Sequence, residues 1–205
     1  MTEQRRLAAI LVADVVGYSK LIGSDEAGTL AQLHALRTEV IEPQIAKHAG
    51  RLFKSVGDGF LIEFASAVQA VSCAMAIQKA TPALPLRIGI HVGDVVIQGD
   101  DLMGDGVNVA ARVEGIAEPG GIAITRAVHE QVRDKLDLGF TDKGEIELKN
   151  IQRPVQVFVI GGPKPAAQPT ALPLPDKPSI AVLPFQNMSG DSEQEYFTEI
   201  GRAHV

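Results

Sequence analysis

The sequence is poor in several features that would each point to a particular class of protein. It has one cysteine, Cys73, in 205 residues, so a disulfide framework within one chain and a cysteine-rich zinc cluster are both excluded. Cys73 lies in the apolar pattern AVSCAMAI and is predicted to be a buried structural thiol. The net charge is −6 and the only adjacent basic residues are Arg5 and Arg6, so no nucleic-acid partner is expected.

Long hydrophobic runs are also missing. At the amino terminus, charged residues precede a short apolar run, Leu7–Ala13, which Asp14 interrupts. This run is too short for the core of a secretory signal and for a membrane-spanning helix. We therefore expect a cytoplasmic protein with no membrane segment in this chain.

Apolar residues make up 45% of the chain, which is enough for one full hydrophobic core. Helical spacing of apolar residues predicts helices over 25–46, 67–80, 107–116 and 126–135. Strand-like runs are expected at 7–15, 51–56, 60–64, 86–92, 95–98, 121–124, 145–148 and 155–160. The alternation of the two patterns predicts an α+β sandwich over residues 1–160.

Turn and cap residues mark where these elements begin and end. Ser24 or Asp25 is placed to cap the first helix, and Pro43 is expected to kink or end it. Gly57-Asp58-Gly59 predicts a tight hairpin between two strands, and Gly93-Asp94 predicts a second one. Residues 161–178 contain six prolines and two glycines and are predicted to form an extended linker.

Two aspartates occupy positions that suit a metal site. Asp14 follows an apolar strand, and Asp58 lies in the predicted hairpin. If these strands are neighbours in one sheet, the two carboxylates converge and offer hard oxygen ligands for Mg²⁺ or Mn²⁺. From spacing alone, a pair of turn-stabilising aspartates fits equally well.

The run DLMGDGVNVAAR places Asn108 and Arg112 four residues apart, on one face of a predicted helix. An amide and a guanidinium on one face suit orientation of a ribose and stabilisation of phosphoryl charge. The alternative is a surface helix whose Arg112 pairs with Glu114, Glu118 or another acid.

Lys54 stands on the strand before the hairpin. Period-2 alternation places it on the same face as the apolar Leu52 and Val56, where a lysine needs a partner. Asp101 is either that partner or a solvated loop acid.

Taken together, five motifs resemble the class III adenylate/guanylate cyclase catalytic domain. In chain order they are ILVADVVGYSKL, FKSVGDGFLIEF, LRIGIHVGDVV, DLMGDGVNVAARVE and ELKNIQRPVQVFVI. The resemblance spans about Arg5 to Ile160. It implies a ferredoxin-like α/β sandwich with a mostly antiparallel sheet, and a head-to-tail homodimer with active sites between the protomers.

The resemblance also implies a role for individual residues. Asp14 and Asp58 match metal-binding aspartates that hold two Mg²⁺ or Mn²⁺ ions per site. Lys54 and Asp101 match the pair that reads adenine, and Lys149 matches a lysine that contacts the triphosphate. Asn108 matches the ribose-orienting residue, and Arg112 matches the transition-state residue. Metal ligands from one protomer would meet Asn108 and Arg112 of its partner.

The implied function is an adenylate cyclase, which converts ATP to 3′,5′-cyclic AMP and pyrophosphate in intracellular signalling. Lys54 can donate to adenine N1 and Asp101 can accept from the N6 amine, whereas guanine presents the opposite polarity at those edges. Two alternatives stay open, a guanylate cyclase and a catalytically silent module that binds nucleotide or only dimerises.

Beyond the linker, residues 179–198 resemble the truncated start of a TolB-like domain and are too few to form a core. The last seven residues, 199–205 (EIGRAHV), look like translated sequencing adapter and are expected to be non-native.

Overall fold

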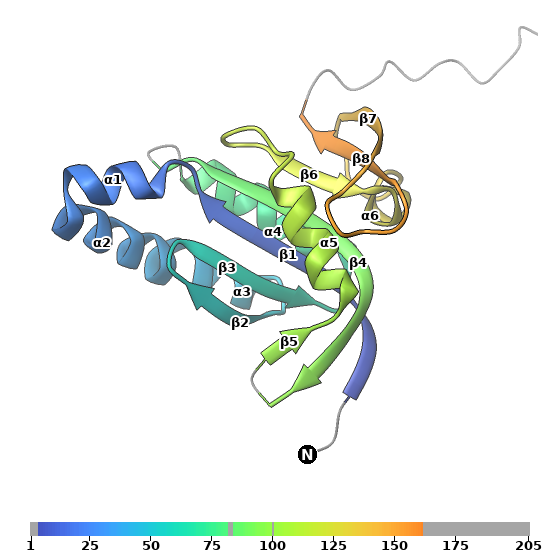
Figure 1. Ribbon diagram of the computed structural model, residues 1–205, viewed down its shortest axis with the longest axis horizontal. Helices are drawn as coiled ribbons and strands as arrows, with labels where there is room; N and C mark the ends of the chain where they lie inside the picture. The colour runs from blue at the N-terminus through green and yellow to red at the C-terminus, as the bar shows by residue number, and fades with distance from the viewer. Residues whose placement is uncertain (1–3, 82–83, 100, 162–205) are drawn as a thin grey trace, which may run out of the picture. The chain divides into compact units, whose positions relative to one another are not determined.

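A computed structural model describes residues 4–81, 84–99 and 101–161 (Figure 1). The predicted linker 161–178, apart from Gly161, and the predicted segments 179–198 and 199–205 lie outside the described residues. The elements in chain order are β1 (Gln4–Val15), α1 (Tyr18–Ser24), α2 (Glu26–Ala35), a π-helical stretch (Leu36–Ile41), α3 (Glu42–Lys47), β2 (Gly50–Val56), β3 (Gly59–Phe64), α4 (Ala67–Ala80), β4 (Leu86–Gln98), β5 (Asp101–Met103), α5 (Asp105–Glu114), β6 (Ile122–Thr125), α6 (Arg126–Val132), β7 (Phe140–Ile146) and β8 (Val155–Ile160).

The strands form one sheet in the order β2-β3-β1-β4-β6-β8-β7, with β5 paired to β4. Among the described strands, every pair is antiparallel except β4 with β6. The order β2-β3-β1-β4, with helices between β1 and β2 and between β3 and β4, is a ferredoxin-like arrangement. The predicted α+β fold with a mostly antiparallel sheet is confirmed. No helix in the described part of the chain is long and apolar enough to cross a membrane.

Helices cover both faces of β1, with α5 on one face and α4 on the other (Figure 1). The odd-numbered residues from Ala9 to Val15 belong to the same buried cluster as α4. Ala8 and Ile10 belong to the cluster that includes Ala110 of α5. A strand buried on both faces needs apolar residues at successive positions, which explains the nearly continuous apolar run of β1.

The first predicted helix is broken into segments. The Asp25 side chain accepts a hydrogen bond from Gly28 N at 2.9 Å and caps α2, as predicted. Pro43 does not end the helix, because α3 continues to Lys47 after the π-helical stretch Leu36–Ile41. Proline lacks an N–H and its ring crowds the preceding turn, so a locally wider turn fits its position in the helix.

The predicted hairpin at Gly93-Asp94 is wrong. β4 runs without interruption from Leu86 to Gln98 and pairs with β1 from Leu86 to Ile97. The chain turns instead at Gly99, whose φ of 64° is in the left-handed region, before β5 pairs back onto β4.

The glycines of β4 allow α5 to approach the sheet closely. A Cβ built on Gly89 would lie 2.2 Å from the backbone N of Glu114 and 2.5 Å from the carbonyl O of Ala110. One built on Gly93 would lie 3.2 Å from the Cα of Gly106. The backbone of α5 therefore rests directly on the backbone of β4, so this strand has glycine where the helix packs.

The Gly89→Ala substitution should therefore destabilise the protein strongly. The new methyl group meets helix backbone that cannot rotate away, and we expect a loss of about 3 kcal/mol, the upper part of the range for overpacking. For a domain of this size that lowers Tm by roughly 6–12 °C in a thermal melt. In Gly23→Ala, where a Cβ meets nothing within 4 Å, Tm should not fall. If both variants had the same Tm as the parent, the close packing of α5 on β4 would be contradicted.

Candidate active site

The structure brings Asp14 and Asp58 together, as predicted. Asp14 lies on β1 opposite Gly59 of β3, and Asp58 precedes Gly59 in the hairpin, where Gly57 has a φ of 60°. Burial raises the pKa of Asp58 above its usual value, and the neighbouring Asp14 carboxylate raises it further, while a backbone hydrogen bond and the charge of Arg87 oppose the shift. The strand pairing thus creates a concentrated negative charge.

This pair fits a small divalent cation. Mg²⁺ and Mn²⁺ bind through one or two carboxylates and complete their shells with water and substrate phosphates. Within the described residues, no group of three or more histidine, cysteine, aspartate or glutamate side chains could hold a metal. The two aspartates therefore suit ions that arrive with a phosphorylated substrate better than a closed structural metal centre.

Two charged residues beside this pair were not recognised from the sequence. Arg87 lies opposite Asp14 in the β1–β4 register, with Nη2 3.5 Å from Asp14 Oδ2. Its Nε lies 3.2 Å from Oε1 of Glu114 on α5. Burial raises the pKa of Glu114. The charge of Arg87 opposes this upward shift, and the charges of the two aspartates reinforce it. The alternation in LRIGI, with Arg87 between the buried Leu86 and Ile88, is the sequence pattern that could have indicated a charged side chain on the opposite face of this strand.

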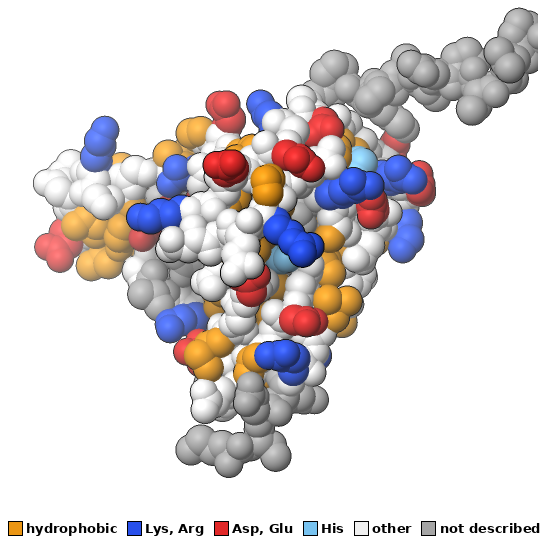
Figure 2. Space-filling model, turned by 45° about the vertical axis from the view of Figure 1, so that its right-hand side comes forward, with side chains coloured by type: hydrophobic (Ala, Val, Ile, Leu, Met, Phe, Trp, Pro, Cys, Tyr) orange, Lys and Arg blue, Asp and Glu red, His pale blue; other side chains and the backbone are white. Residues whose placement is uncertain are grey.

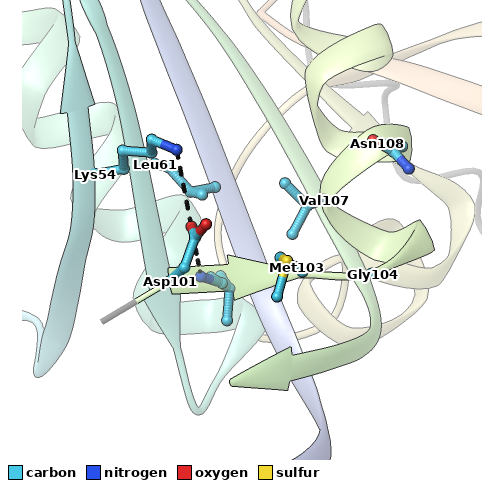
Figure 3. A pocket seen from close by; sticks show the side chains of 8 residues that line it. Lys54, Leu61, Asp101, Met103, Gly104, Val107 and Asn108 are labelled. Atoms are coloured by element: carbon cyan, nitrogen blue, oxygen red, sulfur yellow. Dashed lines mark hydrogen bonds and ion pairs between the residues drawn. The ribbon is translucent and has the colours of Figure 1, made fainter. Parts of the chain in front are cut away.

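Lys54 and Asp101 lie side by side in a pocket of about 430 Å³ (Figure 3). Lys54 Nζ is 3.9 Å from Asp101 Oδ1, which also accepts a hydrogen bond from Leu102 N at 3.0 Å. About half of each side chain is exposed. Asp101 is thus the partner of Lys54, although both groups are open to a ligand. The pocket is lined by Lys54, Leu61, Asp101, Leu102, Met103, Gly104, Val107 and Asn108.

The predicted face of Lys54 is wrong. The pairing of β2 with β3 shifts register between Leu52 and Lys54, so that Leu52 is opposite Ile62 and Lys54 is opposite Leu61. Leu52 packs against the cluster under α4, whereas Leu61 packs against the cluster under α5. The extra residue of this β-bulge reverses the alternation and turns Lys54 toward the pocket.

Asn108 and Arg112 both lie on α5 and are exposed. Asn108 lines the pocket, across from the Lys54–Asp101 pair (Figure 3). The alternative in which Arg112 pairs with Glu114 is not observed, because Glu114 pairs with Arg87. In the described part of the chain Arg112 makes no ion pair, so its guanidinium faces solvent.

Lys149 is not brought to the pocket. It is an exposed residue of the loop between β7 and β8 and does not line the pocket. Asp14 and Asp58 do not line the pocket either. One copy of the chain therefore carries two separate groups, the aspartate pair and the Lys54–Asp101–Asn108 pocket. On the described part of the face in Figure 2, basic and acidic side chains are interspersed and form no continuous basic surface.

His91 on β4 is a further titratable group close to α5. Its Nδ1 lies 3.0 Å from Thr125 Oγ1, and Thr125 is buried. Burial lowers the pKa of His91 from 6.5 to about 4, and the charge of Asp105 opposes this shift. The imidazole is therefore neutral in the folded protein at pH 7.

We expect His91 to make stability depend on pH. Between pH 6.5 and about 4 the unfolded chain binds a proton that the folded His91 does not, so stability is lost as pH falls through this window. At pH 5 the loss relative to neutral pH should be about 2 kcal/mol. Urea unfolding at the two pH values measures it, and His91→Gln should show a correspondingly smaller loss. Equal losses in parent and variant would contradict the lowered pKa.

Residues 2–162 match the family described as Adenylate and Guanylate cyclase catalytic domain. A Rhizobium meliloti (strain 1021) protein named "Putative adenylate cyclase 3" is 50% identical over 212 residues. The alignment covers 96% of this chain, and the chain spans 36% of the length of that relative.

Two solved structures resemble the fold closely. The crystal structure of an adenylate/guanylate cyclase/hydrolase from Silicibacter pomeroyi has 42% sequence identity and a TM-score of 0.73, and the match covers 78% of this chain and 98% of that one. The crystal structure of the adenylyl cyclase CyaB from P. aeruginosa has 26% identity and a TM-score of 0.70, covering 79% and 97%. The family match includes every predicted site residue, from Asp14 to Lys149.

Proposed function

Because this chain belongs to the adenylate and guanylate cyclase catalytic-domain family, we propose that it is an adenylate cyclase, a lyase that converts ATP to 3′,5′-cyclic AMP and pyrophosphate. The observation that carries the choice of ATP is the Lys54–Asp101 pair, 3.9 Å apart in one pocket. The proposal includes a cytoplasmic location, where the cyclic AMP would serve intracellular signalling.

The pocket offers groups of the polarity that adenine needs. The Lys54 ammonium is a donor for adenine N1, and the Asp101 carboxylate is an acceptor for the N6 amine. Leu61, Leu102 and Val107 provide apolar surface for the flat faces of the ring. Guanine has an N1–H donor and an O6 acceptor at the same edge. Its N1–H would face the Lys54 ammonium, also a donor, and its O6 would face the Asp101 carboxylate, also an acceptor.

In the reaction the ribose 3′-hydroxyl gives up its proton to water or to a substrate phosphate, and its oxygen forms a bond to the α-phosphorus. The bond between the α-phosphorus and the pyrophosphate oxygen breaks, and pyrophosphate leaves. Asp14 and Asp58 would hold two Mg²⁺ or Mn²⁺ ions. When bound, such ions lower the pKa of the 3′-hydroxyl and neutralise phosphate charge. Asn108 would orient the ribose, Arg112 would stabilise negative charge on the α-phosphoryl oxygens and Lys149 would contact the triphosphate.

In the proposed enzyme, two copies of the chain share each active site. Within one copy the aspartate pair and the pocket with Asn108 are separate groups of residues, and Arg112 faces solvent. A head-to-tail homodimer supplies the missing half of each site from the partner, because a two-fold axis repeats every contact between the copies. A monomer should therefore be inactive.

Turnover of ATP and GTP, supplied together with Mn²⁺, tests the proposal. We expect cyclic AMP to exceed cyclic GMP and the specific activity to rise with protein concentration as the dimer forms. Predominant cyclic GMP would make the chain a guanylate cyclase. No product from a verified dimer at high protein concentration would make it a silent module that binds nucleotide or only dimerises.

A further inference from the structure

Arg87 is placed between two acids with different surroundings. Its Nε lies 3.2 Å from Glu114 Oε1, and its Nη2 lies 3.5 Å from Asp14 Oδ2. The Glu114 side chain is 13% exposed, whereas those of Arg87 and Asp14 are 34% and 31% exposed. Glu114 is the most buried of the three, so its charge most needs a compensating partner.

Glu114 and Arg87 depend on each other for that compensation. Glu114 Oε1 and Arg87 Nε are buried, and neither has a hydrogen-bond partner among the described residues. They face each other only as an ion pair. Moreover, the backbone of Glu114 rests on Gly89, where no space remains for the helix to shift toward the strand. Glu114 is therefore a fixed anchor for the guanidinium.

The position of this guanidinium matters for the aspartate pair. A cation that approached Asp14 and Asp58 more closely would compete with a divalent ion for the same oxygens. With Glu114 present, Arg87 divides its attraction between the two acids. Without it, Asp14 and Asp58 are the anionic groups left beside Arg87.

We propose that Glu114 is a positioning residue of the Asp14–Asp58 site, which holds the Arg87 guanidinium toward α5 and so leaves both aspartates available to a divalent cation. The assignment of the two aspartates as metal ligands rests on the proposed function. The role of Glu114 follows from the Glu114–Arg87–Asp14 contacts. It acts through Arg87 and touches neither substrate nor product.

Binding of Mn²⁺ alone to the full 205-residue chain tests this role, measured by the loss of the electron paramagnetic resonance signal of free Mn²⁺. Glu114→Gln should raise the Kd for Mn²⁺ roughly tenfold, the scale at which a neighbouring charge shifts an ionisation equilibrium. Arg87→Gln should lower the Kd several-fold, because it removes the competing cation. The double variant should bind Mn²⁺ as tightly as Arg87→Gln does, since Glu114 acts through Arg87 and has no effect once Arg87 is removed.

Glu118→Gln is the matched control, because it removes the same charge four residues further along at an exposed position. It should leave the Kd unchanged. Equal weakening by Glu118→Gln and Glu114→Gln would overturn the proposal, as would a double variant that binds Mn²⁺ no better than Glu114→Gln. A merely structural role would not make Glu114→Gln and Arg87→Gln shift the Kd in opposite directions.

Thermal melts show whether Glu114→Gln folds. If it does not, Arg87→Gln and the double variant decide, and weaker Mn²⁺ binding than the parent in either one overturns the proposal. The measurement needs no turnover, so its outcome is separate from that of the proposed function. Predicted Kd shifts in an inactive chain would support the positioning role alone, whereas active chains without the shifts would overturn it and leave the cyclase proposal intact.

Discussion

Chains carrying Asp14→Ala and chains carrying Arg112→Ala should regain cyclase activity when they are mixed, although each has little or no activity by itself. In the proposed dimer, each active site takes its aspartates from one copy and its Arg112 from the other. The mixed dimer then has one site with both substitutions and one site with neither. The intact site needs no new contact to work.

The individual losses should be large. Arg112→Ala removes a positioned donor for the developing phosphoryl charge, which costs about 3–4 kcal/mol, or roughly 10²–10³ in kcat. Asp14→Ala removes one of two metal carboxylates, and we expect no measurable turnover. Random pairing makes half of the dimers mixed, with one intact site in two, so the mixture should reach about a quarter of the parent activity.

A mixture of Asp14→Ala and Asp58→Ala chains is the matched control. Both substitutions damage the same half of a site, so neither site of the mixed dimer is intact and no activity should return. Differently tagged chains that purify together show whether mixed dimers form. If they form and the Asp14→Ala and Arg112→Ala mixture stays inactive, the two halves belong to one chain and the shared-site proposal fails.

The second large effect concerns the choice of base. Lys54→Glu combined with Asp101→Ser should shift the preference from ATP toward GTP by about 10² or more in the ratio of kcat/KM values, because polar groups that the bound base covers reject a substrate that leaves them unpaired. The carboxylate introduced in place of the Lys54 ammonium would accept from guanine N1–H, and the introduced serine hydroxyl would donate to O6. Paired assays with both nucleotides measure the ratio.

The control for this change is Lys47→Glu combined with Asp134→Ser. Both residues are exposed and lie outside the pocket, so the charge changes are the same but the ratio should stay at the parent value. If the Lys54 and Asp101 substitutions lower activity on both nucleotides and leave the ratio unchanged, the pair does not read the base.

Much of the fold was predictable because its signals are local. Alternation and apolar runs identified the strands 51–56, 60–64 and 155–160, and helical spacing identified 67–80 with the bounds that α4 has. The side-chain cap from Asp25 was also predicted. These features depend on residues within a few positions of one another, so the order of residue types is sufficient to indicate them.

The errors arose where distant segments impose a conformation. Gly93-Asp94 has the composition of a turn, yet β1 pairs with β4 through that point and α5 packs on its glycines. Lys54 has a regular alternation around it, yet the bulge against β3 reverses its face. The sequence alone does not distinguish a glycine that permits a turn from one that permits close packing of a helix. A β-bulge likewise has no residue pattern of its own by which it could be predicted.

Residue types and their spacing were thus enough to predict an α+β sandwich. The resemblance of five motifs to the class III cyclase family added the cyclase fold and completed the set of seven candidate residues, whose roles remain predictions. They could not show that Arg87 lies between Asp14 and Glu114, because these residues are distant in sequence and meet only through strand register and the packing of α5 on Gly89. Local preferences act over a few residues, whereas a charge cluster is assembled by contacts across the whole sheet. The surroundings of each carboxylate, and hence its pKa and its partners, follow from that assembly.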